Sequence, residues 1–173
     1  DRGDESLSRA VQVIEVGPRD GLQNEKNPLS TDFKLGLIQR LESCGFPEVE
    51  VTSMVHPKWV PQLADAADLL ERLQSLPQSG RRTVLVPNSK GLERAVAAGA
   101  KRVAVFIAAS ESFSQKNTNR SIEESLEQTG AVVERALELG LSVRGYLSTV
   151  FVCPFEGNIQ PATAAHLTKR LLA

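Results

Sequence analysis

The feature of this sequence that most limits its fold is a regular alternation of short apolar segments with longer amphipathic ones. The apolar segments are rich in β-branched residues, as buried strands are, and each is followed by a stretch with the apolar period of an α-helix. Strands are predicted at residues 11–16, 49–52, 83–86, 102–107 and 141–147. Helices are predicted at residues 31–44, 62–76, 90–98, 121–139 and from 161 onward. This alternation favours an α/β fold with a parallel sheet and right-handed crossovers.

Two architectures fit this alternation, and the periodicity leaves both open. One is an open, doubly wound sheet, and the other is part of a (β/α)8 barrel, the TIM-barrel fold. A complete barrel needs about 250 residues, so a chain of 173 residues accounts for about the first five βα units. The phosphate-binding patterns GxGxxG and GxxxxGK[ST], which would favour an open nucleotide-binding sheet, do not occur. We predict a polar N-terminal tail at residues 1–10 and one domain at residues 11–173.

Composition and charge exclude several classes of partner. The formal net charge is -1, so no overall basic field attracts nucleic acid or an anionic membrane. No apolar run approaches the ~20 residues that span a bilayer. An anionic ligand therefore needs a local group of cations, and the loop candidates are Lys26, Lys58, Lys116 and Arg120.

Two further residues are assigned to packing rather than to chemistry. Cys44 and Cys153 lie outside any CxxC pattern, and Cys44 is expected in the core, on the apolar face of a helix. Trp59 is expected to anchor its loop by packing.

The densest group of polar residues follows the first predicted strand, in the segment GPRDGLQNEK at residues 17–26. In parallel α/β proteins, the loops at the carboxyl ends of the strands form the active face. Asp20 offers the oxygen ligand that a hard divalent cation prefers, and Arg19 beside it can stabilise a developing oxyanion. The alternative is a local Arg–Asp pair that shapes a turn.

The second predicted strand carries two carboxylates, Glu48 and Glu50, which are expected to face opposite sides. A carboxylate that faces the core is costly unless it is paired. Glu50 is the better candidate for the inward position, with Arg19 as its partner, and the alternative is a glutamate in solvent. Ser53 follows at the carboxyl end of this strand and offers a hydroxyl group. Tyr146, near the end of the fifth strand, can bond a substrate oxygen or be buried against the backbone.

Several segments, in order along nearly the whole chain, resemble one family. VIEVGPRDGLQNEK (13–26) is similar to the signature region of the 3-hydroxy-3-methylglutaryl-CoA (HMG-CoA) lyases. So are EVTSMVHPKWVPQLADA (50–66), AVAAGAKRVAVFIAASESF (95–113), VRGYLS (143–148) and CPFEG (153–157). The RDGxQ core is shared with a wider superfamily of barrel enzymes that make or break C–C bonds. The longer GPRDGLQNEK form is more specific to the lyases.

This resemblance implies an incomplete TIM barrel of the pyruvate-carboxyltransferase type, truncated at the C-terminus. It implies that the parent protein is a carbon–carbon lyase that splits HMG-CoA into acetyl-CoA and acetoacetate, a reaction of leucine catabolism and ketone-body formation. Mg²⁺ or Mn²⁺ would hold the oxygens of the substrate. The implied partners are an acyl-CoA and a second copy of the full-length protein, with no nucleic acid and no membrane. Both the bacterial cytoplasm and the mitochondrial matrix fit the resemblance.

The resemblance also implies roles for individual residues. Asp20 corresponds to a metal ligand, Arg19 to the residue that stabilises the enolate, and Glu50 to the acidic partner that orients Arg19. The remaining correspondences are Gln23, Ser53 and Tyr146 near the acyl group, and Lys26 near the CoA moiety.

Other parts of the implied site are missing from the chain. The family's further metal ligands are an H-x-H pair on the sixth strand and a later Asn, and its catalytic cysteine lies in a Gly-rich lid. The sequence holds no H-x-H, and Cys153 belongs to CPFEG instead. A single aspartate holds Mg²⁺ weakly, because the ion needs about six oxygen ligands. We therefore predict that the 173-residue chain is inactive or nearly so, whereas its parent is an active lyase.

Two departures from the family pattern suggest another substrate. Ile107 stands where the family has a glycine, and residues 149–152 replace a run of smaller side chains. Ile107 and Phe151 are expected to narrow the acyl pocket, which makes a related 3-hydroxyacyl-CoA such as citramalyl-CoA an alternative substrate. The sequence is also compatible with a Claisen-type acyltransferase of the same superfamily and with a non-catalytic fragment.

Overall fold

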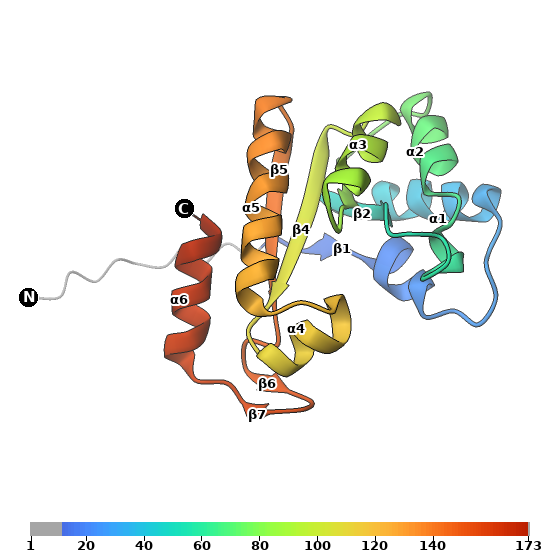
Figure 1. The fold of residues 1–173 in the computed structure, drawn as a ribbon. Helices are drawn as coiled ribbons and strands as arrows, with labels where there is room; N and C mark the ends of the chain where they lie inside the picture. Colours follow the sequence, from blue (N-terminus) through green and yellow to red (C-terminus); the bar gives the residue numbers. More distant parts are fainter. Residues whose placement is uncertain (1–11, 173) are drawn as a thin grey trace, which may run out of the picture.

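The computed structural model, which describes residues 12–172, is built around one parallel sheet (Figure 1). Its strand order is β1-β2-β3-β4-β5, so every strand pairs in parallel with the next one along the chain. A doubly wound sheet reverses its strand order at a switch point, whereas this sheet does not and curls into part of a barrel. The strands are β1 (Ile14–Glu15), β2 (Glu48–Ser53), β3 (Arg81–Leu85), β4 (Arg102–Ala108) and β5 (Ser142–Ser148).

The predicted strands and helices are confirmed as elements, with changes at their ends. The first strand is shorter than the predicted 11–16, and the predicted helix at 62–76 is split into a 3-10 turn, η2 (Pro61–Leu63), and a shorter α-helix. The predicted tail at 1–10 lies outside the described residues. The helices that cover the sheet are α1 (Thr31–Ser43), α2 (Ala66–Gln74), α3 (Ser89–Ala97), α5 (Ile122–Glu138) and α6 (Pro161–Leu172).

Side-chain caps fix where the helices begin. The Ser30 hydroxyl accepts from the Phe33 amide at the start of α1, and the Asn88 side chain accepts from the Gly91 amide at the start of α3. Ser121 and Glu124 form the capping box that the sequence pattern suggests. Each cap satisfies amide groups that the first turn of a helix leaves unpaired.

Two elements at the carboxyl end of the sheet were not predicted. One is a helix, α4 (Glu111–Thr118), and the other is a hairpin of β6 (Val152–Cys153) with β7 (Gly157–Asn158). They are joined to each other by the Ser112 amide, which donates to Glu156 at 2.5 Å, and by Phe113 and Phe155, whose ring centroids lie 6.2 Å apart.

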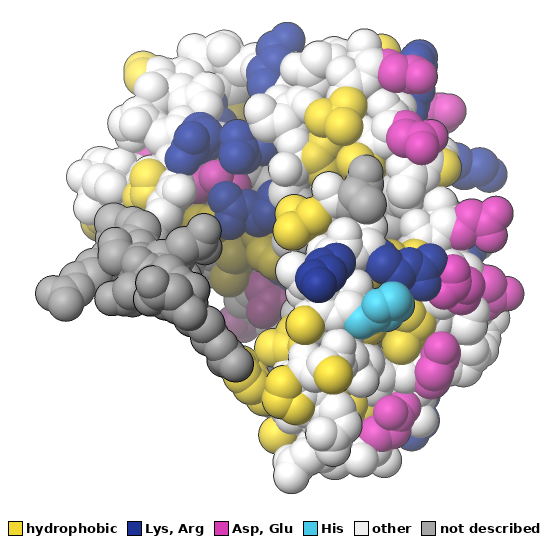
Figure 2. All heavy atoms as spheres, turned by 90° about the vertical axis from the view of Figure 1, so that its left-hand side faces the viewer, with side chains coloured by type: hydrophobic (Ala, Val, Ile, Leu, Met, Phe, Trp, Pro, Cys, Tyr) yellow, Lys and Arg dark blue, Asp and Glu magenta, His cyan; other side chains and the backbone are white. Residues whose placement is uncertain are grey.

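The hydrophobic core lies between the outer face of the sheet and the helices. Strand residues such as Val49 and Val105 pack there against helix residues such as Leu69 and Leu92, all at most 2% exposed. The inner face of the sheet is polar by contrast, since it carries the glutamates of β2. One side of the molecule is hollowed, and Lys and Arg side chains gather beside the hollow (Figure 2). No helix of the described residues is long and apolar enough to cross a membrane.

Two packing predictions are wrong. Cys44 is exposed, because it is the C-cap of α1 and the chain turns away there at Gly45, whose φ is 83°. Trp59 is 80% exposed and therefore does not anchor its loop by burial.

Candidate functional site

A tight turn directly after β1 positions the first polar residues of the site. The chain forms one π-helical turn, η1 (Gly17–Gly21), in which the Leu22 amide donates to the Gly17 carbonyl. At its start, the Asp20 amide donates to the Val16 carbonyl at 2.7 Å. The Gly17 amide donates to the Glu15 carboxylate at 2.5 Å, and a Cβ on Gly17 would lie 2.6 Å from the same oxygen. A larger residue at position 17 would displace the Glu15 carboxylate from this contact, and the turn holds Arg19 and Asp20 at the carboxyl end of β1.

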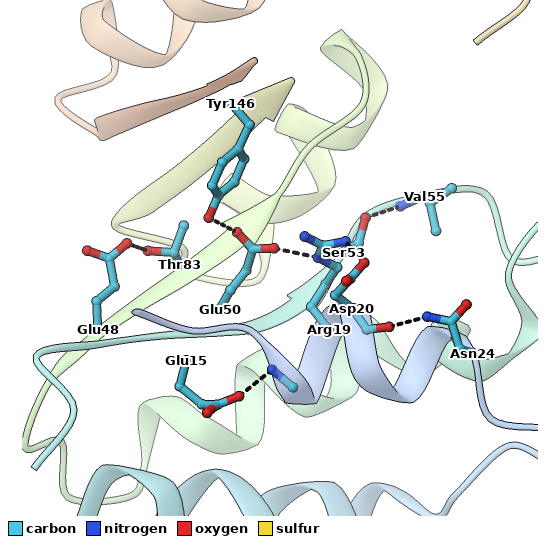
Figure 3. Close-up of polar contacts among 11 residues, drawn as sticks. Glu15, Arg19, Asp20, Asn24, Glu48, Glu50, Ser53, Val55, Thr83 and Tyr146 are labelled. Carbon is cyan, nitrogen blue, oxygen red and sulfur yellow. Dashed lines mark hydrogen bonds and ion pairs between the residues drawn. The ribbon is translucent and has the colours of Figure 1, made fainter. Parts of the chain in front are cut away.

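Glu50 is the centre of the site (Figure 3). Its side chain is fully buried, and its two oxygens bind different donors: Arg19 Nε bonds one, and Tyr146 Oη bonds the other at 2.7 Å. Arg19 Nη1 donates to Asp20 Oδ1 at 2.7 Å. The expected contact between Arg19 and Glu50 is therefore present, and the guanidinium is fixed from two sides.

Tyr146 enters the site from β5, on the same face as Glu50. Burial of the phenol, together with its hydrogen bond to the Glu50 carboxylate, raises the pKa of Tyr146 above its ordinary value. The phenol is consequently a protonated hydrogen-bond donor at neutral pH. The phenol bonds the Glu50 carboxylate instead of the backbone, and the expected contact of Tyr146 with a substrate oxygen stays a prediction.

Glu48 also faces the interior, so the expectation that it faces away from Glu50 is wrong. Residues two apart on a strand share a face. Glu48 is fully buried, and its carboxylate accepts from Thr83 Oγ1 at 2.5 Å and from Arg144 Nη2 at 2.8 Å. Sequence reasoning missed Arg144, although its position two residues before Tyr146 on β5 places both on one face.

An irregularity in β2 brings Ser53 to the interior face as well. The pairing with β3 shifts between Glu50 and Thr52, so that Thr52 pairs with Val84 and Ser53 with Leu85. Val84 packs in the core between sheet and helices, which places Thr52 on that outer face and Ser53 on the inner one. The Ser53 hydroxyl accepts from the Val55 amide at 3.2 Å. Thr52 Oγ1 is buried without a hydrogen-bond partner among the residues described.

The other expected site residues are less tightly held. Gln23 is partly buried and Lys26 is exposed. Among the loop cations, Lys116 Nζ lies 3.6 Å from the centroid of the Phe155 ring, and Arg120 donates to the Thr118 carbonyl at 3.2 Å. These contacts belong to α4 and the β6–β7 hairpin rather than to the Arg19–Glu50–Tyr146 group.

A metal site is incomplete in this part of the protein. The Asp20 side chain is 57% exposed and already bonds Arg19. Residues 12–172 hold no group of three or more His, Cys, Asp or Glu side chains that could bind a metal ion. Asp20 can thus supply one oxygen ligand, and the residues present do not by themselves form a cation site.

The expectation that Ile107 narrows an acyl pocket is wrong, whereas the expectation for Phe151 stays a prediction. Ile107 points away from the barrel interior and packs with Ala109, Leu126 and Leu167 between β4 and the helices. Phe151 is 82% exposed. The strand alternation explains the result for Ile107, because its neighbours Phe106 and Ala108, not Ile107, share the face of Arg102.

Comparisons with known proteins agree with this geometry. The profile of the HMGL-like family matches residues 10–173. The mitochondrial hydroxymethylglutaryl-CoA lyase of Bos taurus is 53% identical over 166 residues, which are 96% of this chain and 51% of the relative. The chain thus spans about half the length of that relative.

Solved structures share the fold. The HMG-CoA lyase of Brucella melitensis aligns with a TM-score of 0.88 at 46% identity, over 94% of this chain and 57% of the other. An HMG-CoA lyase of Acinetobacter baumannii, in complex with coenzyme A and 3-methylmalate, aligns with a TM-score of 0.86 at 33% identity, over 93% and 52%. The five parallel strands therefore form an incomplete TIM barrel, and the chain belongs to the HMGL-like family.

Proposed function

We propose that the full-length protein containing this chain is an HMG-CoA lyase, which cleaves HMG-CoA to acetyl-CoA and acetoacetate. The observation that carries the proposal is the arginine of the GPRDGLQNEK turn, held at the carboxyl end of the sheet by a fully buried glutamate. The relatives and solved structures that align with nearly the whole of this chain bear the name of that enzyme. An acyl-CoA is accordingly the proposed substrate class.

The arrangement suits the charge that this reaction develops. Cleavage of the C–C bond leaves negative charge on the oxygen of a thioester enolate, which a fixed cation stabilises without rearranging. Arg19 uses Nε for Glu50 and Nη1 for Asp20, while Nη2 has no hydrogen-bond partner among the described residues. Nη2 is the N–H group that we assign to the developing enolate oxygen.

Glu50 and Tyr146 act on Arg19 rather than on the substrate in this proposal. The Glu50 carboxylate fixes the plane of the guanidinium, and the Tyr146 hydroxyl occupies the second carboxylate oxygen at 2.7 Å. Both are positioning residues. A divalent cation, when bound, would neutralise charge on the substrate oxygens. Asp20 is its one candidate ligand among the described residues. We place the other metal ligands in the part of the full-length protein beyond this chain. The contacts of a dimer are placed in that part as well.

An assay of the full-length protein tests the proposal. With Mg²⁺ or Mn²⁺ it should release acetyl-CoA from HMG-CoA, and Arg19→Lys should lower kcat by about 10²–10³-fold because the planar fork is lost. The matched control is Arg135→Lys, at an exposed pair with Glu138. Wild-type kcat in the Arg19→Lys enzyme would overturn the role of Arg19. Turnover by the isolated 173-residue chain would overturn the proposal that further metal ligands lie beyond this chain.

Two further reactions can be tested in the same assay. The packing of Ile107 away from the barrel interior removes one of the two observations that favoured citramalyl-CoA, and we expect HMG-CoA to be cleaved in preference to it. A Claisen-type acyltransferase would instead condense acetyl-CoA with pyruvate or 2-oxoisovalerate. Condensation faster than HMG-CoA cleavage would refute the lyase.

A further inference from the structure

The floor of the partial barrel holds a cluster of charges that the lyase site does not use. Its centre is the fully buried Glu48, and three arginines from three different strands converge on one of its oxygens, Oε2. The distances from Oε2 are 2.8 Å to Arg144 Nη2, 3.3 Å to Arg102 Nε and 3.5 Å to Arg81 Nε. We call Glu48, Arg81, Arg102 and Arg144 the floor cluster.

The floor cluster has more positive than negative charge. Within 4.0 Å, the ion pairs of these three arginines among residues 12–172 all go to Glu48. Three guanidinium groups and one carboxylate leave a local charge of about +2, because arginine stays protonated in proteins. Like charges this close repel one another, and burial strengthens the repulsion between Arg102 and Arg144 because water screens it less. The side chain of Arg81 is 52% exposed, so water screens its charge more.

Hydrogen bonding in the floor cluster is also incomplete. The side chains of Arg102 and Arg144 are only 22% and 23% exposed. The Nε atoms of both are buried and lack a hydrogen-bond partner in the described part of the chain, since Arg102 Nε meets Glu48 at ion-pair distance without hydrogen-bond geometry. A buried guanidinium N–H that makes no hydrogen bond costs free energy. The excess of positive charge and the unpaired N–H groups thus both favour binding of a further anion.

The floor cluster is separate from the Arg19 site. Glu48 lies two residues before Glu50 on the same face of β2, which places their Cα atoms about 7 Å apart along the strand. Arg81 and Arg102 are the first residues of β3 and β4, so the cluster lies at the amino end of the strands. In TIM barrels this end supports stability, whereas chemistry occurs at the other.

We propose that the floor cluster is a binding site for a carboxylate. A planar anion with two oxygens matches the fork of a guanidinium group, and it would bring the local charge close to zero. The carboxylate could be an Asp or Glu side chain from the half of the parent barrel beyond this chain, or a free carboxylate ion. A second copy of this chain is a poor occupant, because it would bring the same three arginines against the first three.

Thermal unfolding of the 173-residue chain tests the site without any measurement of lyase activity. Citrate or malonate, compared with NaCl at equal ionic strength, should raise Tm in a saturable way, by about 3–6 °C at ten times the Kd. Arg102→Gln should abolish the rise, and Arg135→Gln, at an exposed pair, should retain it. Glu48→Gln should shift the midpoint to a lower anion concentration, because it removes the carboxylate that competes for the arginines.

The outcomes separate the site from general salt effects and separate the two sources of the carboxylate. An equal rise in Tm for wild type and Arg102→Gln, or no saturation, overturns the proposal. Should Arg102→Gln fail to fold, an unchanged midpoint in Glu48→Gln overturns it instead. In the full-length protein, a lost response to citrate identifies a side chain as the occupant, and an unchanged response identifies a free ion.

Discussion

Glu50 offers the most direct test of the proposed organisation of the site, through the change Glu50→Gln. The substitution keeps the size of a fully buried side chain but removes the charge that pairs with Arg19. Removal of one partner from a buried ion pair typically costs about 3–5 kcal/mol. Arg19 is 15% exposed and keeps its bond to Asp20, and glutamine keeps one acceptor, so we expect a loss of about 2–3 kcal/mol in the free energy of unfolding.

Urea unfolding of the 173-residue chain, followed by far-UV circular dichroism, measures this loss. The fluorescence of Trp59 is a weak reporter, because the side chain is 80% exposed in the folded state. For a chain of this length, 2–3 kcal/mol corresponds to a fall in Tm of about 5–10 °C. The control is Glu138→Gln, which removes the same charge from an exposed pair with Arg135 and should cost about 0–1 kcal/mol. Equal unfolding midpoints for the two variants would refute the reasoning.

A pH titration and two sets of substitutions test other parts of the structure. Burial raises the pKa of Tyr146, the single tyrosine of the chain. Its ultraviolet tyrosinate absorbance should therefore appear near pH 10 in urea and only at higher pH in the folded chain. The contribution of Tyr146 to stability is full below about pH 10 and is lost as the pH rises through the pKa of the folded state. Gly80→Ala would place a Cβ 2.7 Å from a backbone carbonyl oxygen and should cost about 1–3 kcal/mol, whereas Gly130→Ala in α5, with no atom within 4 Å, should gain up to about 1 kcal/mol. Arg82→Ala would leave Glu42, which it bonds at 2.7 and 2.9 Å in the core, buried and unpaired, so a loss of about 3–5 kcal/mol is expected in urea unfolding.

The sequence predicted those parts of the fold that depend on local patterns. The parallel pairing of the strands follows from the alternation, because a βα crossover returns the chain to the same end of the sheet. The choice between a barrel and an open sheet did not follow, since both share this local pattern, and the family resemblance decided it. Helix α4 (Glu111–Thr118) was missed because it has no apolar period; Ser110 caps it, and contacts with a hairpin about 40 residues later hold it.

Prediction of the site was limited in the same way. The contact of Arg19 with Glu50 could be expected, because a buried carboxylate needs a cation and the turn after β1 supplies one. The bond from Tyr146 to Glu50 joins residues 96 positions apart, and only the curled arrangement of the five strands reveals it. The inward position of Glu48 followed from strand geometry alone and was missed by assigning it to the opposite face.

The irregular pairing in β2 affects how this strand can change in length during evolution. Val51 and Thr52 both lie on the outer face, so together they fill a place that one residue fills in a regular strand. Loss of either one would restore regular alternation and leave Glu50 and Ser53 facing inward. Loss of Val49 would instead turn Glu48 toward the helices and break the floor cluster. A deletion among homologues should therefore be tolerated at position 51 or 52 and should not occur at position 49.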